Sequence, residues 1–388
     1  MRVLLLTTKN LLPMNSGGLV GSNGMLRFLY DSGYAVTLVN FYEKDDYTSE
    51  QITELRHYAE EIYTVKLTWP SVALNLSIRY PNSIRKYTRR GMKKVLSELD
   101  SRKHFQIVVI DHVQMYEYAK LFPDARIILH THNMECNLWY DHAKNCSRIS
   151  RPLILRNAAM LKEYEKWAFL SADGVLTCSE TDREDFRQLA PECNAATMHS
   201  YIRFEPVKTE EDIRNRDNSI LFIGTYSWEP NADAAEYLID EVMPELREKL
   251  TGIKLYLVGK DPTEAMRMKA QQYGDIIITG MVESIDPYIK KADVFVNTVT
   301  KGSGINIKVI EAMGKGIPVI SSEFGARGID AEEGRDFLIY RSCKELTKHI
   351  EKVISDKEQA ERLSNNARKF YLNFIQPGED VRRMFEQE

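Results

Sequence analysis

A glycine-rich stretch near residue 305 has the residue types needed to bind an anion. It reads Lys301-Gly-Ser-Gly-Ile-Asn-Ile-Lys-Val-Ile-Glu-Ala-Met-Gly-Lys-Gly-Ile-Pro-Val-Ile, and it leads from a predicted strand through a loop into a short predicted helix. Amides at the start of a helix have no partner within the helix, and the helix dipole favours negative charge there. We therefore expect three free amides to face a diphosphate: those of Gly304, Ile305 and Asn306.

Two charged side chains on the following helix extend this predicted site. Lys308 adds a positive charge for the same anion. Glu311, one turn inside the helix, can accept hydrogen bonds from the two hydroxyls of a ribose, as acidic residues do in other nucleotide sites. A glycine-rich loop alone would be weak evidence, but loop, lysine and glutamate in this order predict a nucleotide diphosphate site.

A second glycine-rich loop follows the first predicted strand and reads Asn15-Ser-Gly-Gly-Leu-Val-Gly-Ser-Asn-Gly. Gly17 and Gly18 let the backbone approach a ligand closely, and amides at the start of the next helix can hold an anion. The loop lacks the G-x-G-x-x-G pattern of dinucleotide sites. The alternative is that these glycines only form a flexible turn.

Histidines follow two neighbouring predicted strands. The segment His130-Thr-His-Asn-Met-Glu comes directly after one of them. His130 or His132 can hydrogen-bond a sugar hydroxyl or serve in acid–base catalysis, and His112 and Glu135 are weaker candidates for contacts on the acceptor side. A structural role for this loop is one alternative. A metal site is another, but H-x-H-x-x-E in a loop is weak evidence, and we expect no metal.

Short apolar runs alternate with helix-like stretches along the whole chain, which predicts parallel sheets covered on both faces. This alternation of strands and helices occurs in two successive sets. We therefore expect two doubly wound, Rossmann-like α/β domains with the boundary near residue 205. The charged stretch Lys208–Asn218 reads as a solvated connector. The predicted strands are Val3–Leu6, Ala35–Val39, Ile107–Ile110, Arg126–Leu129 and Gly174–Thr177, then Ser219–Ile223, Lys254–Val258, Ile276–Thr279, Val294–Asn297 and Pro318–Ser321. The predicted helices are Gly24–Asp31, Leu161–Leu170, Ala232–Glu248, Ile307–Met313 and two within Asp356–Glu388.

Composition excludes several classes of protein. The chain has 388 residues, 43% of them hydrophobic and 28% charged, which fits a globular protein with two domains. The net charge of −4 gives no basic field for nucleic acid. The five cysteines are scattered without zinc or redox spacing, so we expect reduced thiols. The apolar run at the start is too short for a signal peptide or a membrane span, so we expect a cytoplasmic protein.

The segment Leu74–Leu96 is strongly basic. It has seven cations and no acid, with leucine, isoleucine and tyrosine between them. Such a segment can bind anionic lipid at the inner face of a membrane, where each cation contributes about 1 kcal/mol. A solvated basic helix face is the alternative. The cations are Arg79, Arg85, Lys86, Arg89, Arg90, Lys93 and Lys94.

Taken together, these motifs resemble the retaining glycosyltransferases of family 4, which have the GT-B fold. The stretch Gly304–Val319 closely resembles the donor-binding signature of that family. The resemblance extends over roughly residues 1–370, and His132-Asn-x-Glu is similar to a branch that assembles bacterial polysaccharides. The other matching segments are Gly17-Gly18, Ile223–Thr225, Leu257–Gly259, Ala292–Val296 and Trp228-x-Pro-Asn.

The resemblance implies a GT-B fold with two domains facing a central cleft. It implies an N-terminal acceptor-side domain over residues 1–205 and a C-terminal donor domain over 206–388. The terminal helices, from about residue 366 to 388, are expected to cross back to the first domain. The donor is then a nucleotide-diphosphate sugar, bound without a metal ion or other cofactor.

The family's functional residues carry over only at matching positions. Glu311 matches the glutamate that contacts the ribose, and Gly17 and Gly18 match the loop facing the diphosphate. His132 matches the histidine near the donor sugar, with His130 as a shifted alternative. Gly224, at the start of the second domain, falls within the matching Ile-Gly-Thr and joins the donor-binding set.

Two departures from the family pattern affect the donor site. Ser303 replaces the glutamate that normally touches the donor sugar, so the identity of the sugar does not follow from the resemblance. The Arg/Lys pair expected after the second domain's first strand is also missing. We expect Lys308, helped by Lys260, to supply the missing positive charge.

The sequence thus predicts transfer of a hexose-type sugar, with retention, to a glycan or lipid-linked acceptor in surface polysaccharide synthesis. Capsule or lipopolysaccharide is the expected product. Two alternatives stay open at this point: a non-catalytic protein that binds nucleotide sugars, and a nucleotide-sugar epimerase of GT-B fold. A Rossmann dehydrogenase is disfavoured by the missing G-x-G-x-x-G pattern.

Overall fold

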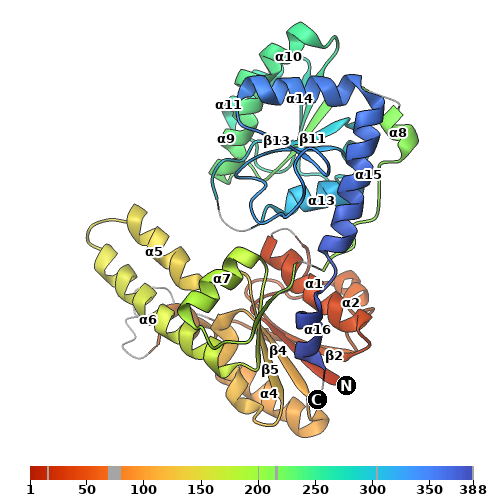
Figure 1. Cartoon of the computed structure of the whole chain (residues 1–388). Helices are drawn as coiled ribbons and strands as arrows, with labels where there is room; N and C mark the ends of the chain where they lie inside the picture. The colour runs from red at the N-terminus through yellow and green to blue at the C-terminus, as the bar shows by residue number, and fades with distance from the viewer. Residues whose placement is uncertain (15–16, 69–79, 200, 215–216, 303–304, 387–388) are drawn as a thin grey trace. The chain divides into compact units, whose positions relative to one another are not determined.

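The chain forms two compact α/β units (Figure 1). A computed structural model describes residues 1–14, 17–68, 80–199, 201–214, 217–302 and 305–386. Unit 1 comprises Met1–Ile202 and Ile375–Glu388, and unit 2 comprises Arg203–Phe374. The last segment therefore returns to unit 1, while the helix before it remains part of unit 2.

Unit 1 is built on a parallel sheet of seven strands in the order β3-β2-β1-β4-β5-β6-β7. Val3 pairs with Val36 on one side and with Ile107 on the other, so β1 lies at the centre of the sheet. The strands are β1 (Arg2–Thr7), β2 (Ala35–Tyr42), β3 (Glu61–Lys66), β4 (Ile107–Asp111), β5 (Arg126–Thr131), β6 (Gly174–Thr177) and β7 (Ala195–Thr197). The helices are α1 (Gly17–Asp31), α2 (Ser49–Leu55), α3 (Asn82–Tyr87), α4 (Arg90–Lys103), the 3₁₀ helix η2 (Val113–Leu121), α5 (Glu135–Asn145), α6 (Arg151–Ser171), α7 (Glu180–Leu189) and α16 (Glu379–Phe385).

Unit 2 repeats the plan with a parallel sheet of six strands in the order β10-β9-β8-β11-β12-β13. The strands are β8 (Ser219–Ile223), β9 (Lys254–Val258), β10 (Ile276–Gly280), β11 (Val294–Asn297), β12 (Val319–Ser322) and β13 (Leu338–Tyr340). The helices are α8 (Glu210–Arg214), α9 (Glu229–Tyr237), the π-helical turn η3 (Leu238–Val242), α10 (Met243–Lys249), α11 (Glu264–Gln272), α12 (Asp286–Lys291), α13 (Ile307–Lys315), α14 (Cys343–Ser355) and α15 (Lys357–Phe374). Both sheets follow the Rossmann order, in which the strand sequence reverses direction beside the first strand.

The central strands are buried on both faces, which explains their continuous apolar sequences. Every residue of β4 is buried, as is every residue of β11. Residues of alternate faces belong to separate cores: Val108 and Ile110 pack in one cluster, while Ile107 and Val109 pack in another. The two cores of unit 1 therefore lie on opposite sides of one sheet, and helices cover both.

The last segment completes one of these cores. Val381, Met384 and Phe385 of α16 are buried with residues of α1 and β1. The Phe385 ring meets the Phe28 ring edge-on at 5.2 Å, and the Tyr34 hydroxyl donates to the Phe385 carbonyl at 3.2 Å. The end of the described chain is thus part of the fold of unit 1.

All ten predicted strands are present, and the described part of the chain contains three further strands that the sequence analysis missed. The missed strands are β3, β7 and β13, and each forms an edge of its sheet. An edge strand needs no continuous apolar run, because one of its sides has no neighbouring strand. The sequence of β3, Glu-Ile-Tyr-Thr-Val-Lys, is accordingly polar at both ends, and β7 and β13 have three residues each.

Two local predictions need correction. Helix α1 begins at Gly17 rather than at Gly24, so Gly17 and Gly18 lie in its first turn and not in a loop. The stretch after residue 208 is not simply a solvated connector. Lys208 is buried, its ammonium donates to the carbonyls of Lys290 and Ala292, and α8 forms just after it.

Two glycines bring the ends of β8 and β9 together. Gly259 has φ +142°, and a Cβ built there would lie 1.8 Å from the Gly224 carbonyl oxygen. We expect Gly259→Ala to lower the free energy of unfolding by about 3 kcal/mol, because the backbones must separate and the residue is strained. Urea denaturation measures this. Gly274→Ala is the matched control, since a Cβ there meets nothing within 4 Å; equal stability of the two variants would contradict the interpretation.

Candidate functional site

Both sheets place polar residues at the point where their strand order reverses. In unit 1 this point lies between β1 and β4, and in unit 2 between β8 and β11. Open α/β sheets bind ligands at the carboxyl ends of the strands at such a point. The residues that follow these strands are therefore the candidates in each unit.

Asp111, the last residue of β4, organises the site in unit 1. Its carboxylate is fully buried and accepts a 2.5 Å hydrogen bond from the Ser22 hydroxyl of α1. The His130 Nδ1–H donates to Oδ1 at 2.7 Å, and the His132 Nε2–H donates to the same oxygen at 2.9 Å. Because a carboxylate only accepts, these contacts decide which ring nitrogen carries the hydrogen. His112 Nδ1 lies 3.1 Å from the other oxygen.

Burial and charge distribute the protons in this cluster unevenly. Burial alone would raise the pKa of Asp111, but His112 and His132 hold it well below its usual range. Burial lowers the pKa of His132 to about 4, against the opposing effect of Asp111. At His112 burial would lower the pKa, but the charge of Asp111 and its hydrogen bond together with the charge of Glu135 exceed that effect, so the pKa is raised. At neutral pH the cluster therefore contains the Asp111 anion and a neutral His132, and His112 is the imidazole best placed to be protonated.

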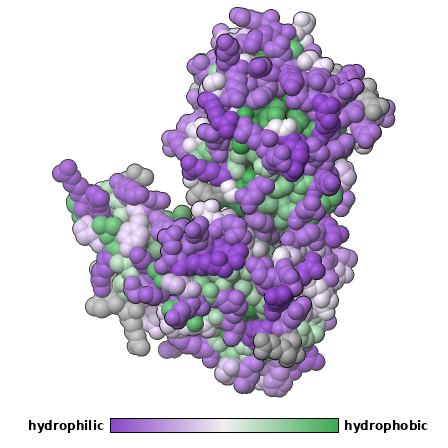
Figure 2. All heavy atoms as spheres, viewed as in Figure 1, coloured by the Kyte–Doolittle hydropathy of each residue, from purple (hydrophilic) through white to green (hydrophobic). Residues whose placement is uncertain are grey.

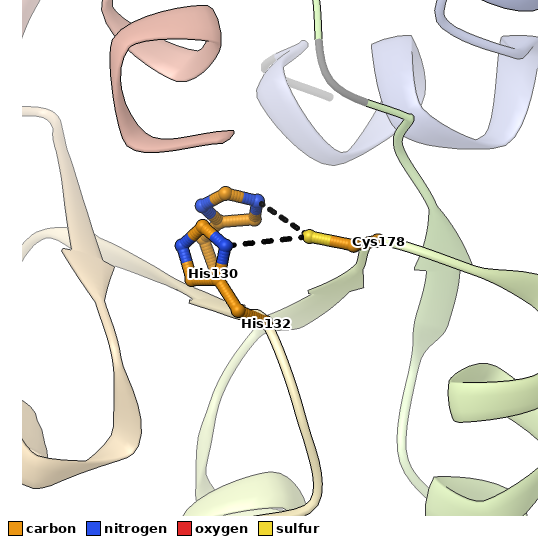
Figure 3. A group of neighbouring side chains, drawn as sticks. All are labelled: His130, His132 and Cys178. Atoms are coloured by element: carbon orange, nitrogen blue, oxygen red, sulfur yellow. Dashed lines mark hydrogen bonds between the residues drawn. The ribbon is translucent and has the colours of Figure 1, made fainter. Parts of the chain in front are cut away.

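Cys178, just after β6, closes the cluster on the other side of the two imidazoles (Figure 3). Its sulfur lies 3.5 Å from His132 Nδ1 and 3.8 Å from His130 Nε2. Burial raises the pKa of this thiol, so it stays protonated. Its single S–H can donate to one of the two imidazoles at a time. Ligands of one tetrahedral zinc ion lie at similar separations, roughly 3.5 Å for nitrogen and sulfur at their usual bond lengths. His130, His132 and Cys178 thus also have the geometry of a three-ligand zinc site.

His112 and Glu135 flank this cluster. His112 has φ +85°, a backbone conformation that is uncommon outside glycine, and its ring lies 4.4 Å from the His132 ring. Glu135 is the first residue of α5, and its charge adds a smaller upward effect on the His112 pKa. The structure therefore gathers the three candidate histidines around Asp111, and Glu135 acts on this cluster only through its charge.

Sequence reasoning missed Asp111, Ser22 and Cys178. Asp111 stands directly before His112, so its place at the end of an apolar strand was a readable signal. Ser22 is 89 residues from Asp111, and no spacing rule connects them. Gly21 has a packing role, because a Cβ there would lie 2.5 Å from the His132 ring. Gly18 differs: a Cβ there meets nothing within 4 Å, so its side opens to free space at the start of α1.

In unit 2, Lys308 of α13 meets Asn231 of α9. Its ammonium donates to Asn231 Oδ1 at 2.6 Å and lies 4.9 Å from the centre of the Phe222 ring. Helix α9 follows β8 and α13 follows β11, so this pair spans the point where the strand order reverses. Burial lowers the pKa of Lys308 to about 7. A Cβ on Gly224 would lie 2.9 Å from Asn231, so this glycine gives the asparagine room.

Glu311 lies one turn after Lys308 on α13. Burial raises the pKa of its carboxyl against the opposing charge of Lys315, whose ammonium is 3.4 Å away. Asn306 directly precedes α13 but its side chain makes no capping hydrogen bond, and Ile305 and Asn306 are partly exposed. Lys260 follows β9 and is partly exposed, and its carbonyl accepts from the Tyr226 amide at 2.9 Å. Ser303 and Gly304 lie outside the described residues.

Comparisons with known proteins identify the fold and indicate the activity. Residues 217–356 match a family model described as Glycosyl transferases group 1, which indicates a glycosyltransferase. A relative from Klebsiella pneumoniae, an uncharacterized 44.6 kDa protein in cps region, is 22% identical over 99% of this chain and 98% of its own length. The matched residues include β8, α9 and α13, and therefore both partners of the Lys308–Asn231 hydrogen bond.

Solved structures resemble the chain over its whole length. The crystal structure of TarM has a TM-score of 0.67 and 12% identity, and covers 99% of this chain and 98% of that one. Anabaena Alr3699/HepE in complex with UDP has a TM-score of 0.65 and 14% identity, and covers 99% of this chain and 97% of that one. These likenesses show the α/β GT-B fold predicted from the sequence.

Removing the charge of Asp111 tests the unit 1 cluster. We expect Asp111→Asn to lower the free energy of unfolding by on the order of 3 kcal/mol, because two imidazole N–H groups and a serine hydroxyl then share a weaker acceptor. It should also shift the His132 titration, which is visible by NMR. Asp141→Asn, an exposed aspartate paired with Lys144, is the control. An Asp111→Asn variant as stable as this control would show that the buried charge does not hold the cluster together.

Proposed function

We propose that the chain is a glycosyltransferase that moves a hexose-type sugar from a nucleotide-diphosphate sugar to a glycan or lipid-linked acceptor. The observation that carries the proposal is the arrangement on α13, where Lys308 and Glu311 lie one turn apart beside the strand-order reversal of unit 2. A nucleotide needs a cation for its diphosphate and an acceptor for its ribose, and this helix presents both. The glycosyltransferase model spans this segment, and the structurally similar HepE has UDP bound.

The proposed mechanism follows from the charge of the leaving group. Breaking the anomeric C–O bond leaves negative charge on the nucleotide diphosphate, and Lys308 with the amides at the start of α13 would stabilise that charge electrostatically. On this proposal no metal ion is needed at the diphosphate. Retention of the anomeric configuration and membership of family 4 are proposed from the sequence resemblance alone.

Unit 1 would contribute its histidines and the first turn of α1. His130 is the last residue but one of β5, and His132 directly follows the strand. Both therefore lie at the edge where parallel sheets bind ligands. We propose that His132 acts near the donor sugar and that Gly17 and Gly18 face the diphosphate. The cps region relative supports a role in surface polysaccharide synthesis, which we propose to take place in the cytoplasm at the inner membrane face.

A thermal-shift panel with EDTA present tests the proposal directly. We expect one of UDP, GDP or ADP, or one of their sugar conjugates, to raise the melting temperature selectively by a few degrees, because a ligand that binds the native state stabilises it. The response identifies the base and the need for a metal together. A shift that appears only when a divalent cation replaces EDTA would overturn metal-free binding, and no shift with any nucleotide would overturn the donor site.

Lys308→Met tests the residue assigned to the diphosphate. We expect it to weaken nucleoside diphosphate binding by tenfold or more, as expected for a lost charge-assisted hydrogen bond, while nucleoside binding changes little. Wild-type affinity should fall from pH 7 to 9 as Lys308 loses its proton through its pKa of about 7, and the variant should lack this dependence. Calorimetric titration measures both. Lys301→Met, which removes an exposed lysine paired with Glu229, is the control; equal losses for nucleoside and diphosphate would refute the assignment.

A further inference from the structure

Helices α5 and α6 form a hairpin whose connecting loop projects from unit 1 (Figure 1). The loop and the start of α6 expose large apolar side chains to solvent. Ile149 is 94% exposed, Leu153 is 45% exposed and Leu155 is 37% exposed. Ile149 lies in the turn just before α6, and Leu153 lies in the first turn of that helix. A side chain as exposed as Ile149 contributes nothing to the core of unit 1.

The same tip carries an excess of positive charge, although Lys144 pairs with Asp141 of α5. From Ala143 to Lys162 the sequence contains no aspartate or glutamate. Among the described residues, Arg148, Arg151 and Arg156 form no ion pair, and all three are exposed. Figure 2 shows hydrophobic and hydrophilic residues side by side on this hairpin.

Hydrogen bonds and buried side chains anchor the base of the hairpin. Glu165 of α6 is buried, and its carboxylate accepts from the Glu135 amide at 2.7 Å and from the Cys136 amide at 3.0 Å. These are free amides at the start of α5, where a negative charge is also favoured by the helix dipole. Leu161 and Phe169 of α6 are buried in the core of unit 1. The apolar tip is therefore presented on a fixed support.

The basic segment identified in the sequence is less well suited to a surface contact. Residues 69–79, including Arg79, lie outside the described structure. Of the rest, Lys86 pairs with Glu43 at 2.5 Å and Lys94 lies 3.8 Å from Glu98. Apolar residues of α4 face the core: Met92, Leu96 and Leu99 are buried. This segment thus offers cations, some of them paired, but no exposed apolar anchor on α4.

We propose that the α5–α6 tip docks on an anionic phospholipid bilayer. Ile149 and Leu153 enter the interface between headgroups and acyl chains, while Arg148, Arg151 and Arg156 pair with lipid phosphates. Exposed apolar side chains beside unpaired cations are what such an interface attracts. We infer a membrane rather than a protein partner because these three exposed arginines all carry positive charge. No described helix is long and apolar enough to cross a membrane, so this contact is peripheral.

Vesicle co-sedimentation of the full chain tests the proposal. The vesicles contain phosphatidylcholine alone or with phosphatidylglycerol, at low and at high salt. We expect binding only with phosphatidylglycerol, and weaker binding at high salt because exposed charges are screened. Ile149→Ser with Leu153→Ser should reduce partitioning at least tenfold. Replacing Arg148, Arg151 and Arg156 by glutamine should reduce it by roughly fivefold for each arginine.

Two matched controls make the result specific. Met281→Ser removes a side chain that is 83% exposed in unit 2 and should leave binding unchanged. Arg85, Arg90 and Lys93 replaced together by glutamine should have a smaller effect than the three tip arginines. Melting temperatures of all variants should match that of the wild type, because the altered side chains are outside the core.

Several outcomes would overturn the proposal. These are no binding of the wild type to anionic vesicles, tip variants that bind like wild type, or loss of binding only in the Arg85/Arg90/Lys93 variant. Concentration-dependent dimers that the Ile149→Ser/Leu153→Ser variant abolishes, without vesicle binding, would instead assign the tip to a second copy of the chain.

Discussion

The buried carboxylate of Asp111 is the constraint on which the polar side of unit 1 depends. A fully desolvated charge is costly unless its lone pairs are used. Here Ser22, His130 and His132 supply three donors, and His112 lies alongside. The serine comes from α1 and both histidines lie at or just after the end of β5, so satisfying the charge at the end of β4 aligns these three elements. The same contacts fix the tautomers of two imidazoles, and so decide which nitrogens are free to interact with anything else.

Unit 2 also buries a charge, but there it is the positive charge of Lys308. Lys308 loses hydration at the reversal point of its sheet, and the Asn231 carbonyl oxygen and the Phe222 ring replace only part of it. Its lowered pKa records that deficit. An anion arriving beside Lys308 would supply the missing interaction, whereas Asp111 already has its donors. The two units share a topology, yet Asp111 accepts from three donors, whereas the described partners of the Lys308 ammonium are one amide oxygen and one aromatic ring.

The sequence predicts the central strands well because burial on both faces forces continuous apolar runs. It does not reveal edge strands such as β3, β7 and β13, which have an unpaired side and need no such run. The candidate histidines were found from their place after strands. The role of Asp111 was not found, because its contacts with Ser22 and His132 arise only once β1, β4 and β5 are neighbours. The start of α1 was placed too late because its glycines look like a loop. The paired state of Lys308 likewise depends on α9, which the local sequence around Lys308 does not show.

The return of residues 375–388 to unit 1 has a consequence for synthesis on the ribosome. Val381, Met384 and Phe385 fill part of the core that Phe28 and Tyr34 line, but they are translated after all of unit 2. The emerging first unit must therefore wait with an open apolar face until the final helix arrives. Unit 2, in contrast, is continuous and can finish folding first. The core of unit 1 can therefore close only after unit 2 has been translated, and until then its apolar face favours aggregation.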